Sequence, residues 1–253
     1  MKLIVGLLCV LLGTGAFAES NDFTATADKI KAAIADERRS EADKARDADR
    51  RPLQTLEFFG LRDNMTVLEL VPGGGWYTAI LAPVLEEKGK LYVSIGADRV
   101  GTANKGKPGF GSLEVIPFAA ENFIRAPGER RSSMPEFSFG VRNKVDLALT
   151  FRNMHNFDEK GRHNMNRAVF EALKSGGQYG VVDHTRRHMQ GDHDEVWRRM
   201  DPVQMIKEVE AAGFKFVDYS NVNYRPDDEL RYEVGRKSVT GNTDRFTLLF
   251  KKP

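Results

Sequence analysis

The chain has 253 residues, of which 41% are hydrophobic and 29% charged, and its formal net charge is +2. This length and composition fit one large soluble α/β domain with a sizeable core. Basic and acidic residues are interleaved along the chain, which argues against a nucleic-acid-binding protein, because the basic residues of such proteins usually cluster.

The first 18 residues have the pattern of a secretory signal peptide. Lys2 precedes an apolar run over residues 3–12, and small residues follow up to an Ala-Phe-Ala segment that ends at Ala18. The run is too short for a transmembrane helix. We therefore expect cleavage after Ala18, a periplasmic or secreted protein, and no stable membrane insertion. The single cysteine, Cys9, lies in the run, so the mature chain would form no disulfide.

Residues 19–51 are predicted to form an N-terminal helical extension before the main domain at 52–253. From Ala27 to about Arg50 the sequence is polar, rich in alanine and high in helix propensity. The closely spaced charges favour a solvated helix with ion pairs between successive turns. A second interpretation is a lid whose basic residues face a ligand.

The main domain alternates strand and helix patterns. Expected strands cover residues 67–71, 91–95, 113–116, 145–151, 179–183, 214–219 and 246–250, and expected helices cover 53–59, 76–85, 160–173 and 202–212. Residues 96–112 and 117–143 are expected to be loops. This alternation predicts a Rossmann-like α/β fold, with a doubly wound, mostly parallel seven-stranded sheet and helices on both faces.

The stretch from Val67 to Thr78 reads as a buried strand, a glycine turn and the start of a helix. Three successive glycines, Gly73, Gly74 and Gly75, allow positive φ angles and a close approach to a ligand. The helix after them would point its free N–H groups back at the turn. The turn is therefore a nucleotide-binding candidate. Its spacing does not fit the six-residue glycine fingerprint of nicotinamide-dependent oxidoreductases.

Four segments, in order along the chain, resemble the class I S-adenosylmethionine-dependent methyltransferases. They are Glu69 with Gly73 and Gly75, the strand end at 146–156, the Leu-Lys-Ser-Gly-Gly segment at 173–177, and Glu-Val-Glu-Ala-Ala-Gly-Phe at 208–214. The resemblance covers residues 52–252. The glycine turn, the signal sequence and the Gly-x-Thr-Asp-Arg-Phe segment at 241–246 are similar, more narrowly, to a branch of predicted secreted or periplasmic methyltransferases.

The resemblance implies S-adenosylmethionine as the cofactor. Glu69 would lie near the amino group of the methionine part, the turn Pro72–Gly75 would lie against the cofactor, and Trp76 would cover it. Glu121 and Asn122, after the third strand, would contact the adenine amine. The alternative for Trp76 is ordinary helix–sheet packing, and the alternative for Glu121 and Asn122 is an ordinary polar loop.

Two positions depart from the family pattern. Val71 stands where the first motif usually has glycine, two residues after the acid. The second strand usually ends in an acid that holds the ribose hydroxyls, and here that position falls near Ser94 or Ile95, with Asp98 the nearest acid.

Methyl transfer is an in-line displacement at a positive sulfur, for which the protein aligns the nucleophile and removes its proton. Candidate bases at the predicted strand ends are His155, Asp183 and His184, and Asn153 could orient a substrate. Arg152 could bind an acidic group. Histidine is favoured as the base because its ordinary pKa lies close to neutral pH. The alternative for each residue is an ordinary hydrogen-bonding role in a loop.

Residues 183–195 are rich in histidine and acidic residues, and His184 and His188 have a helical spacing that could suit zinc. The segment carries no defined ligand signature, so we expect a solvated loop over the site and no metal. The leading hypothesis is methyl transfer from S-adenosylmethionine to a small molecule. The alternative is an exported non-catalytic or repurposed small-molecule-binding protein of the same fold. Neither hypothesis specifies an oligomeric state.

Overall fold

The computed structural model describes residues 23–253, so the predicted signal peptide and its cleavage site lie outside the described residues. Seven strands form one sheet in the order β3-β2-β1-β4-β5-β7-β6. Strands β1 to β5 are parallel, and β7 runs antiparallel to both β5 and β6. The strands are β1 Thr66–Leu70, β2 Lys90–Ser94, β3 Leu113–Ile116, β4 Val145–Phe151, β5 Leu173–His184, β6 Lys215–Ser220 and β7 Arg245–Lys251. The predicted fold class is confirmed.

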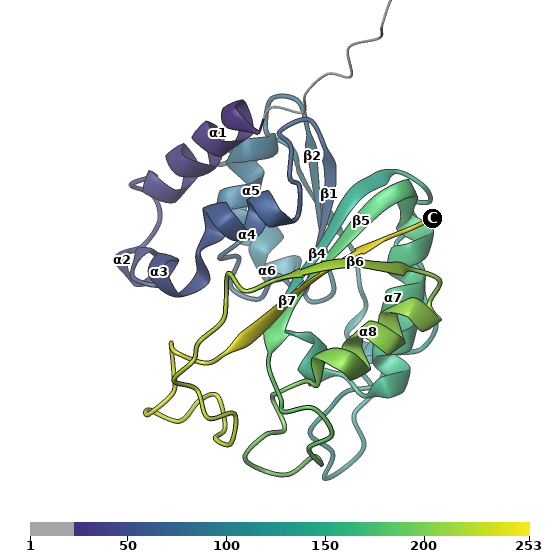
Figure 1. Cartoon of the computed structure of the whole chain (residues 1–253). Helices are drawn as coiled ribbons and strands as arrows, with labels where there is room; N and C mark the ends of the chain where they lie inside the picture. The colour runs from purple at the N-terminus through teal and green to yellow at the C-terminus, as the bar shows by residue number, and fades with distance from the viewer. Residues whose placement is uncertain (1–22) are drawn as a thin grey trace, which may run out of the picture.

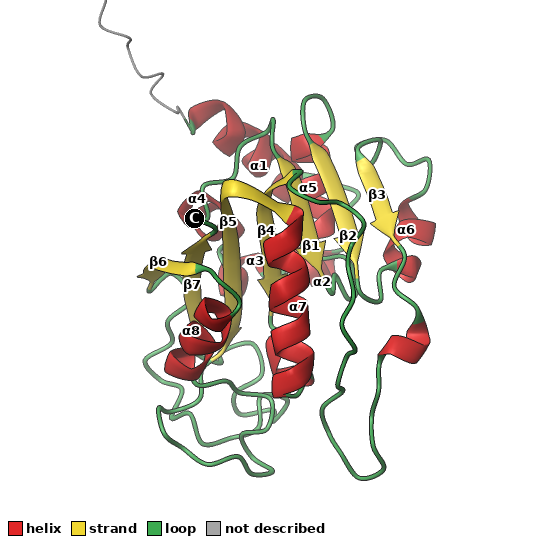
Figure 2. Cartoon of the chain, turned by 90° about the vertical axis from the view of Figure 1, so that its right-hand side faces the viewer, coloured by secondary structure: helices red, strands yellow, loops and turns green. Residues whose placement is uncertain are grey.

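Helices cover both faces of this sheet (Figures 1 and 2). They are α1 Thr24–Ala35, α2 Glu41–Lys44, α3 Asp47–Arg50, α4 Pro52–Phe58, α5 Thr78–Leu85, α6 Asp98–Asn104, α7 Glu159–Ala172 and α8 Pro202–Ala211, with short 3-10 helices η1 Ala120–Asn122 and η2 Met154–Asn156. Neighbouring residues of β1 point to opposite faces. Val67 belongs to the buried cluster that includes residues of α1, α4 and α5, and Leu68 belongs to the cluster that includes residues of α7 and α8. The buried strands read as continuous apolar runs because both faces are covered.

The helix expected over residues 27–50 is wrong as a single element, because the chain breaks it into α1, α2 and α3. Asp36 leaves the helical region with ψ 124°, and its carboxylate accepts hydrogen bonds from the backbone and side chain of Arg38. Ser40 then caps α2 by accepting from Asp43 N–H. These polar side chains compete with the helical backbone for its hydrogen bonds, and the helix ends there.

The loop expected over residues 96–112 is also wrong in part, because it contains α6. This helix is short and carries Gly101, which lowers its helix propensity. Packing explains the glycine, because a Cβ at Gly101 would lie 2.2 Å from Val115 Cγ2 on β3. Strand β5 is longer than predicted and begins at Leu173, directly after α7.

The N-terminal helices are fixed to the rest of the domain through backbone carbonyls. The Trp76 indole N–H donates to Asp43 O at 3.0 Å. Arg225 and Arg245 both donate to Asp49 O, at 2.9 Å and 2.7 Å. As a result α2 and α3 lie beside the segment that leads into β7 (Figure 1). Within residues 23–253, no helix has both the length and the apolar character needed to cross a bilayer.

Candidate functional site

Three parallel strands end with the same strained turn at the point where the strand order reverses. Val71 follows β1, Ile95 follows β2 and Arg152 follows β4, with φ angles of 50°, 63° and 62°. Residues other than glycine avoid this region, β-branched ones most of all. Each such residue costs about 1–3 kcal/mol and persists only where its surroundings hold it. Ligands of open α/β sheets bind in the crevice beside such a reversal. The strain therefore marks the candidate site.

Hydrogen bonds hold these turns in place. Val71 N–H donates to Ser94 O at 2.9 Å, and Arg152 N–H donates to Val182 O at 2.6 Å. The side-chain amide of Asn153 donates to Val71 O at 2.9 Å and to Phe151 O at 3.0 Å. Asn153, expected to orient a substrate, thus joins the ends of β1 and β4.

The glycine turn has one open side and one packed side. Gly73 has φ 58° and Gly75 has φ 80°, and Gly75 N–H closes the turn on Pro72 O at 2.9 Å. A Cβ added at Gly73 or Gly74 would meet no atom within 4 Å. A Cβ at Gly75 would lie 3.3 Å from a methyl group of Val100 on α6. Gly73 and Gly74 therefore leave room for a ligand, whereas Gly75 allows close packing.

Glu69 lies at the end of β1, one residue before the strand ends, and is 2% exposed. Its carboxylate accepts a hydrogen bond from the Thr78 hydroxyl at 2.6 Å. Burial raises the pKa of Glu69 to about 7, although the Thr78 hydrogen bond and the charge of Arg50 act in the opposite direction. A buried acid with this pKa is easily ionised by a ligand cation.

A cavity of about 240 Å³ lies over Glu69 and the glycine turn. Its wall comes from the N-terminal helices, the end of β1 with the turn, the start of α5, and the end of β4: Asp43, Arg46, Arg50, Glu69, Val71, Pro72, Gly73, Gly74, Trp76, Tyr77, Phe151, Arg152 and Asn153. Ligand pockets commonly measure about 300–1,000 Å³. The described cavity therefore accommodates part of a nucleoside-sized ligand, with α2 and α3 covering it.

Two arginines lie against the indole ring of Trp76. The guanidinium of Arg39 lies 5.1 Å from the centre of the indole, and that of Arg50 lies 4.3 Å away. Tyr77 packs edge-on against Trp76 and stacks on Phe151 with centroids 3.5 Å apart. Trp76 lines the cavity, and two cations of the protein itself lie against its ring, so its predicted contact with the cofactor stays a prediction. Trp76 joins the glycine turn to Arg39 and to Arg50 of α3 through cation–π contacts, each of about 0.5–2 kcal/mol. Its hydrogen bond to Asp43 O joins the turn to α2.

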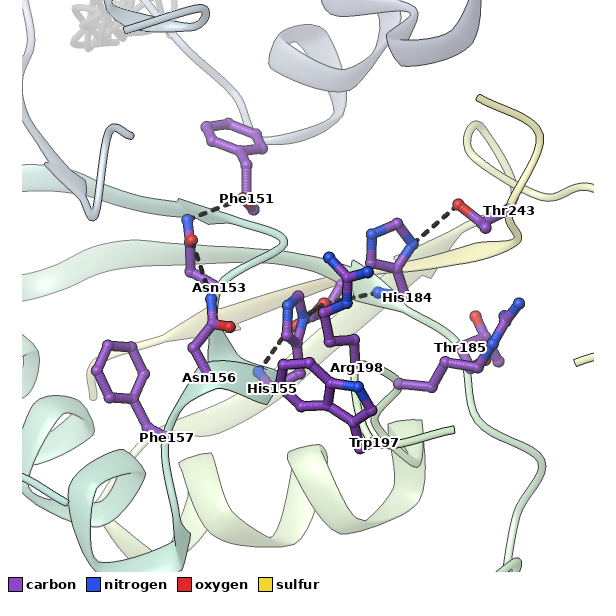
Figure 3. A network of polar contacts seen from close by, with 12 residues as sticks. Phe151, Asn153, His155, Asn156, Phe157, His184, Thr185, Trp197, Arg198 and Thr243 are labelled. Carbon is purple, nitrogen blue, oxygen red and sulfur yellow. Dashed lines mark hydrogen bonds and ion pairs between the residues drawn. The ribbon is translucent and has the colours of Figure 1, made fainter. Parts of the chain in front are cut away.

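The histidine candidates form a buried network at the ends of β4 and β5 (Figure 3). His155 Nδ1 lies 2.6 Å from Asp183 Oδ1, and the same carboxylate accepts the backbone N–H groups of His155 at 3.1 Å and His184 at 2.7 Å. His184 Nδ1 lies 2.9 Å from the Thr243 hydroxyl. The two imidazole centroids are 5.7 Å apart. Burial, then the charge of His155, holds the pKa of His184 well below its ordinary value.

The structure does not bring all predicted residues to one place. Asn153 lines the cavity, whereas His155, Asp183 and His184 do not. Glu121 and Asn122 form η1 after β3 and also lie outside the cavity wall. Their predicted contact with adenine stays a prediction.

The end of β2 carries no acid. Ser94 is buried and donates its hydroxyl to Ile116 O at 3.0 Å, and Asp98 is the exposed first residue of α6. The acid that the family pattern has at the end of the second strand is therefore also missing from this place in the folded site.

The segment at 183–195 is joined to neighbouring arginines. Asp192 pairs with Arg131, and Glu195 pairs with Arg236. His188 Nδ1 lies 2.9 Å from Asp201 Oδ2. Within residues 23–253, no three His, Cys, Asp or Glu side chains gather as metal ligands would.

Sequence reasoning missed Thr243, and it placed Arg46 and Arg50 over a ligand only as members of the charged run in the lid interpretation, without setting them apart. Arg46 and Arg50 line the cavity, but in the sequence they belong to a run of similar charges. Thr243 contacts His184, and its role is visible only after β7 is placed beside β5. A signal did exist for Thr243, because it lies in the Gly-x-Thr-Asp-Arg-Phe segment.

No protein-family model and no curated protein matches the chain. Solved structures do match it. A SAM-dependent methyltransferase from Aquifex aeolicus is 18% identical, with a TM-score of 0.56 over 88% of this chain and 97% of that one. This chain has the methyltransferase fold. Within that fold, the [4+2]-cyclase SpnF is 16% identical, with a TM-score of 0.57 over 91% of this chain and 94% of that one.

Human N-acetylserotonin methyltransferase, solved in complex with SAM, also has the methyltransferase fold. It is 14% identical, with a TM-score of 0.52 over 91% of this chain and 57% of that one. Identities this low establish a common fold, and function has to be argued from the site itself.

Proposed function

We propose that this protein binds S-adenosylmethionine at the carboxyl ends of β1, β2 and β4 and transfers its methyl group to a small molecule. One observation carries the proposal. Glu69 is a buried carboxylate beside an open glycine turn, at the strand-order reversal of a fold that solved SAM-dependent methyltransferases share. Among residues 23–253 its only hydrogen-bond donor is the neutral Thr78 hydroxyl. The carboxylate therefore suits the ammonium group of an amino-acid ligand.

The residues fit the two ends of the cofactor differently. Glu69 and the open backbone of Gly73 and Gly74 fit the methionine end. At the ribose end, Ser94 occupies the place of an acid and uses its hydroxyl on Ile116 O. Charge-assisted hydrogen bonds contribute about 1.5–3 kcal/mol each. We therefore expect weaker binding than in a site with an acid at the end of β2.

The bound cofactor would supply an electrophilic methyl group on a sulfonium cation. His155 is the proposed base, for a methyl acceptor that binds beside the cavity, because His155 lies outside the cavity wall, two residues after Asn153. Asp183 holds the ring through Nδ1 and fixes its orientation, which leaves Nε2 as the nitrogen to accept a proton from the methyl acceptor. Neutral His184 adds no positive charge beside that ring. Asn153, which lines the cavity, fixes the ends of β1 and β4 to each other.

Calorimetric titration of the purified protein with S-adenosylmethionine and S-adenosylhomocysteine tests the proposal. We expect both to bind, and Glu69→Gln to weaken binding about tenfold or more through loss of one charge-assisted contact. Glu136→Gln, on an exposed acid outside the cavity, is the matched control and should bind as the wild type does. Absence of binding heat at high micromolar ligand would contradict the proposal.

A binding protein of the same fold, without methyl transfer, is the second candidate. The missing acid at the end of β2 and the small cavity under α2 and α3 favour it. The solved structure of the [4+2]-cyclase SpnF also indicates that this fold is not confined to proteins named as methyltransferases. Transfer of a radiolabelled methyl group to small molecules of a cell extract separates the two candidates. Cofactor binding without any labelled product would favour the second.

Export is part of the proposal, in line with the resemblance to the secreted or periplasmic branch. The pattern at residues 1–18 supports cleavage after Ala18. Expression of the full chain in a Gram-negative host, followed by fractionation and intact-mass measurement, tests it. A periplasmic product that begins at Glu19 is expected, and an uncleaved cytoplasmic product would contradict it.

A further inference from the structure

Three guanidinium groups line the cavity beside the glycine turn. Arg46 and Arg50 come from the α3 region, and Arg152 comes from the strained end of β4. Within residues 23–253, none of the three side chains donates a hydrogen bond or forms an ion pair. Arg50 is 4% exposed, and its buried Nε has no partner. Its one specific contact is the face of Trp76.

Other buried arginines of this protein have hydrogen-bond partners, which are carboxylates or, for Arg225 and Arg245, backbone carbonyls. Arg199 binds both oxygens of Asp228, at 2.8 Å and 3.0 Å. Arg162 binds both oxygens of Glu208, at 2.6 Å and 2.7 Å. A buried charge without such a partner is costly to fold. Arg50 is therefore an exception that a ligand could explain.

The charges at the cavity do not balance. Two acids line it with the three arginines. Asp43 accepts a hydrogen bond from Ser40, and Glu69 has a pKa raised to about 7, so its negative charge is incomplete at neutral pH. Burial, then the charges of Arg152 and Arg46, lower the pKa of Arg50 to about 9. Burial, then the charge of Arg46, lower the pKa of Arg152 and outweigh the charge of Asp183, which acts in favour of charged Arg152. The arginines thus repel each other more than the acids compensate.

The arginines are also held in place. Asp49, next to Arg50, offers its carbonyl to the guanidiniums of Arg225 and Arg245. These two contacts fix α3 against the main domain, so Arg50 stays over the cavity. Gly73 and Gly74, where an added Cβ would meet no atom within 4 Å, lie in the same wall and leave room for a ligand.

We propose that this cavity binds a phosphate-class dianion, held by Arg46, Arg50 and Arg152. A guanidinium presents paired N–H donors that match the oxygens of phosphate. Three guanidiniums balance a dianion better than they balance a single carboxylate. The group can be free phosphate or the phosphate of a small phosphomonoester, because both present the same oxygens. This is the cavity proposed above for the methionine end of S-adenosylmethionine, so the two ligands would exclude each other, and the anion site does not depend on methyl transfer.

Titration with inorganic phosphate tests the site, by calorimetry and by thermal unfolding at constant ionic strength in a buffer without other oxyanions. The expected result is saturable binding with one phosphate per chain and a rise in the unfolding midpoint. Sodium acetate should bind about tenfold or more weakly, because it carries one charge. Phosphate that gives no saturable response at millimolar concentration, or acetate that binds as tightly, would overturn the proposal.

Arginine variants test whether these side chains bind the phosphate. Arg46 is exposed, so Arg46→Gln should fold, and it should weaken phosphate binding about tenfold or more. Arg46→Lys should retain part of the affinity because the charge remains. Arg167→Gln, on the exposed side of α7, is the matched control and should bind phosphate as the wild type does. Equal binding by the Arg46→Gln and Arg167→Gln variants would overturn the assignment.

Two further titrations identify the source of the phosphate group and separate the anion site from the proposed methyl transfer. Glycerol 3-phosphate that binds more tightly than inorganic phosphate identifies an ester as the ligand, and the reverse order identifies free phosphate. Both results support the site. S-adenosylmethionine is titrated separately into the same protein. A protein that binds phosphate and not the cofactor would retain the anion site and lose the proposed methyl transfer.

Discussion

The side-chain amide of Asn153 donates a hydrogen bond to the carbonyl of Val71 at 2.9 Å, across the ends of β4 and β1. Val71 has φ 50°, which a β-branched residue rarely adopts. The same amide also donates to Phe151 O. One side chain thus fixes the strained turn of β1 to the end of β4, and the floor of the cavity is built from that junction.

Removal of this amide should destabilise the fold. In an Asn153→Ala variant the carbonyls of Val71 and Phe151 lose a donor, so we expect the free energy of unfolding to fall by about 1–3 kcal/mol. Urea unfolding followed by circular dichroism measures this. Asn242→Ala, on an exposed asparagine, should change stability by less than about 0.5 kcal/mol. A loss at Asn153 no larger than the one at Asn242 would show that the junction is not held by the amide.

Strain at Val71 predicts that the usual stability order of an alanine and a glycine variant is inverted at this position. Alanine at this position keeps the unfavourable left-handed backbone, whereas glycine relieves it, a difference of about 1–2 kcal/mol per residue. Elsewhere in strands and helices glycine is about 0.5–1 kcal/mol less stable than alanine. We therefore expect Val71→Gly to be more stable than Val71→Ala. Both variants lose the valine side chain, so their difference isolates the backbone. If alanine is the more stable variant, the turn is not strained.

Glu69 predicts a pH dependence of stability. Its pKa is about 7 in the folded protein against 4.5 for an ordinary glutamate, so between these values the folded state holds a proton that the unfolded state has released. Stability is then greatest below pH 4.5 for this group and falls as the pH rises to about 7. The shift corresponds to about 3 kcal/mol at most.

Comparison of wild type with Glu69→Gln across that range measures the effect. Glutamine keeps the shape and cannot ionise, so the difference in unfolding free energy should move in favour of the variant from pH 4.5 to 7. Other groups titrate equally in both proteins and cancel. A difference that is constant over this range would mean that Glu69 is already ionised at pH 4.5 in the fold.

The fold was predictable because its signals are local. Strands buried on both faces read as apolar runs, and the helix at 202–211 begins with Asp201, whose carboxylate caps it. The missed helix α6 depends on a contact of Gly101 with Val115, which no local pattern reports. Local patterns therefore predicted the strands and the mostly parallel sheet, and they missed the short helix that tertiary packing stabilises.

The candidate site also has parts that the sequence predicts from local patterns and parts that depend on long-range contacts. Glu69 and the glycine turn form one continuous motif, so the sequence predicted them. Arg50 reaches the cavity because Arg225 and Arg245 hold the carbonyl of Asp49, and these partners lie 176 and 196 residues further along the chain. Within the charged run at 38–51, Arg50 has no feature that sets it apart. Its role follows from long-range contacts.

Arg50 and Arg199 should respond in opposite ways to the same substitution. Arg199 is 0% exposed and bound by Asp228, so Arg199→Met leaves a buried carboxylate without its partner and should cost about 3–5 kcal/mol. Arg50 has no carboxylate, and Arg50→Met removes a buried charge while keeping an apolar contact with Trp76. We expect Arg50→Met to raise the free energy of unfolding by about 1 kcal/mol or more in buffer without oxyanions.

Denaturant unfolding of both variants with and without phosphate checks this pair. Phosphate should stabilise the wild type and Arg50→Met should lose that response, because a ligand that binds only the folded state adds stability in proportion to its affinity. A destabilised Arg50→Met variant in phosphate-free buffer would mean that the Trp76 contact outweighs the cost of the buried charge. Arg50 and Arg199 would then both stabilise the fold. A gain in intrinsic stability together with a lost phosphate response is the pattern expected of a residue retained for binding rather than for folding.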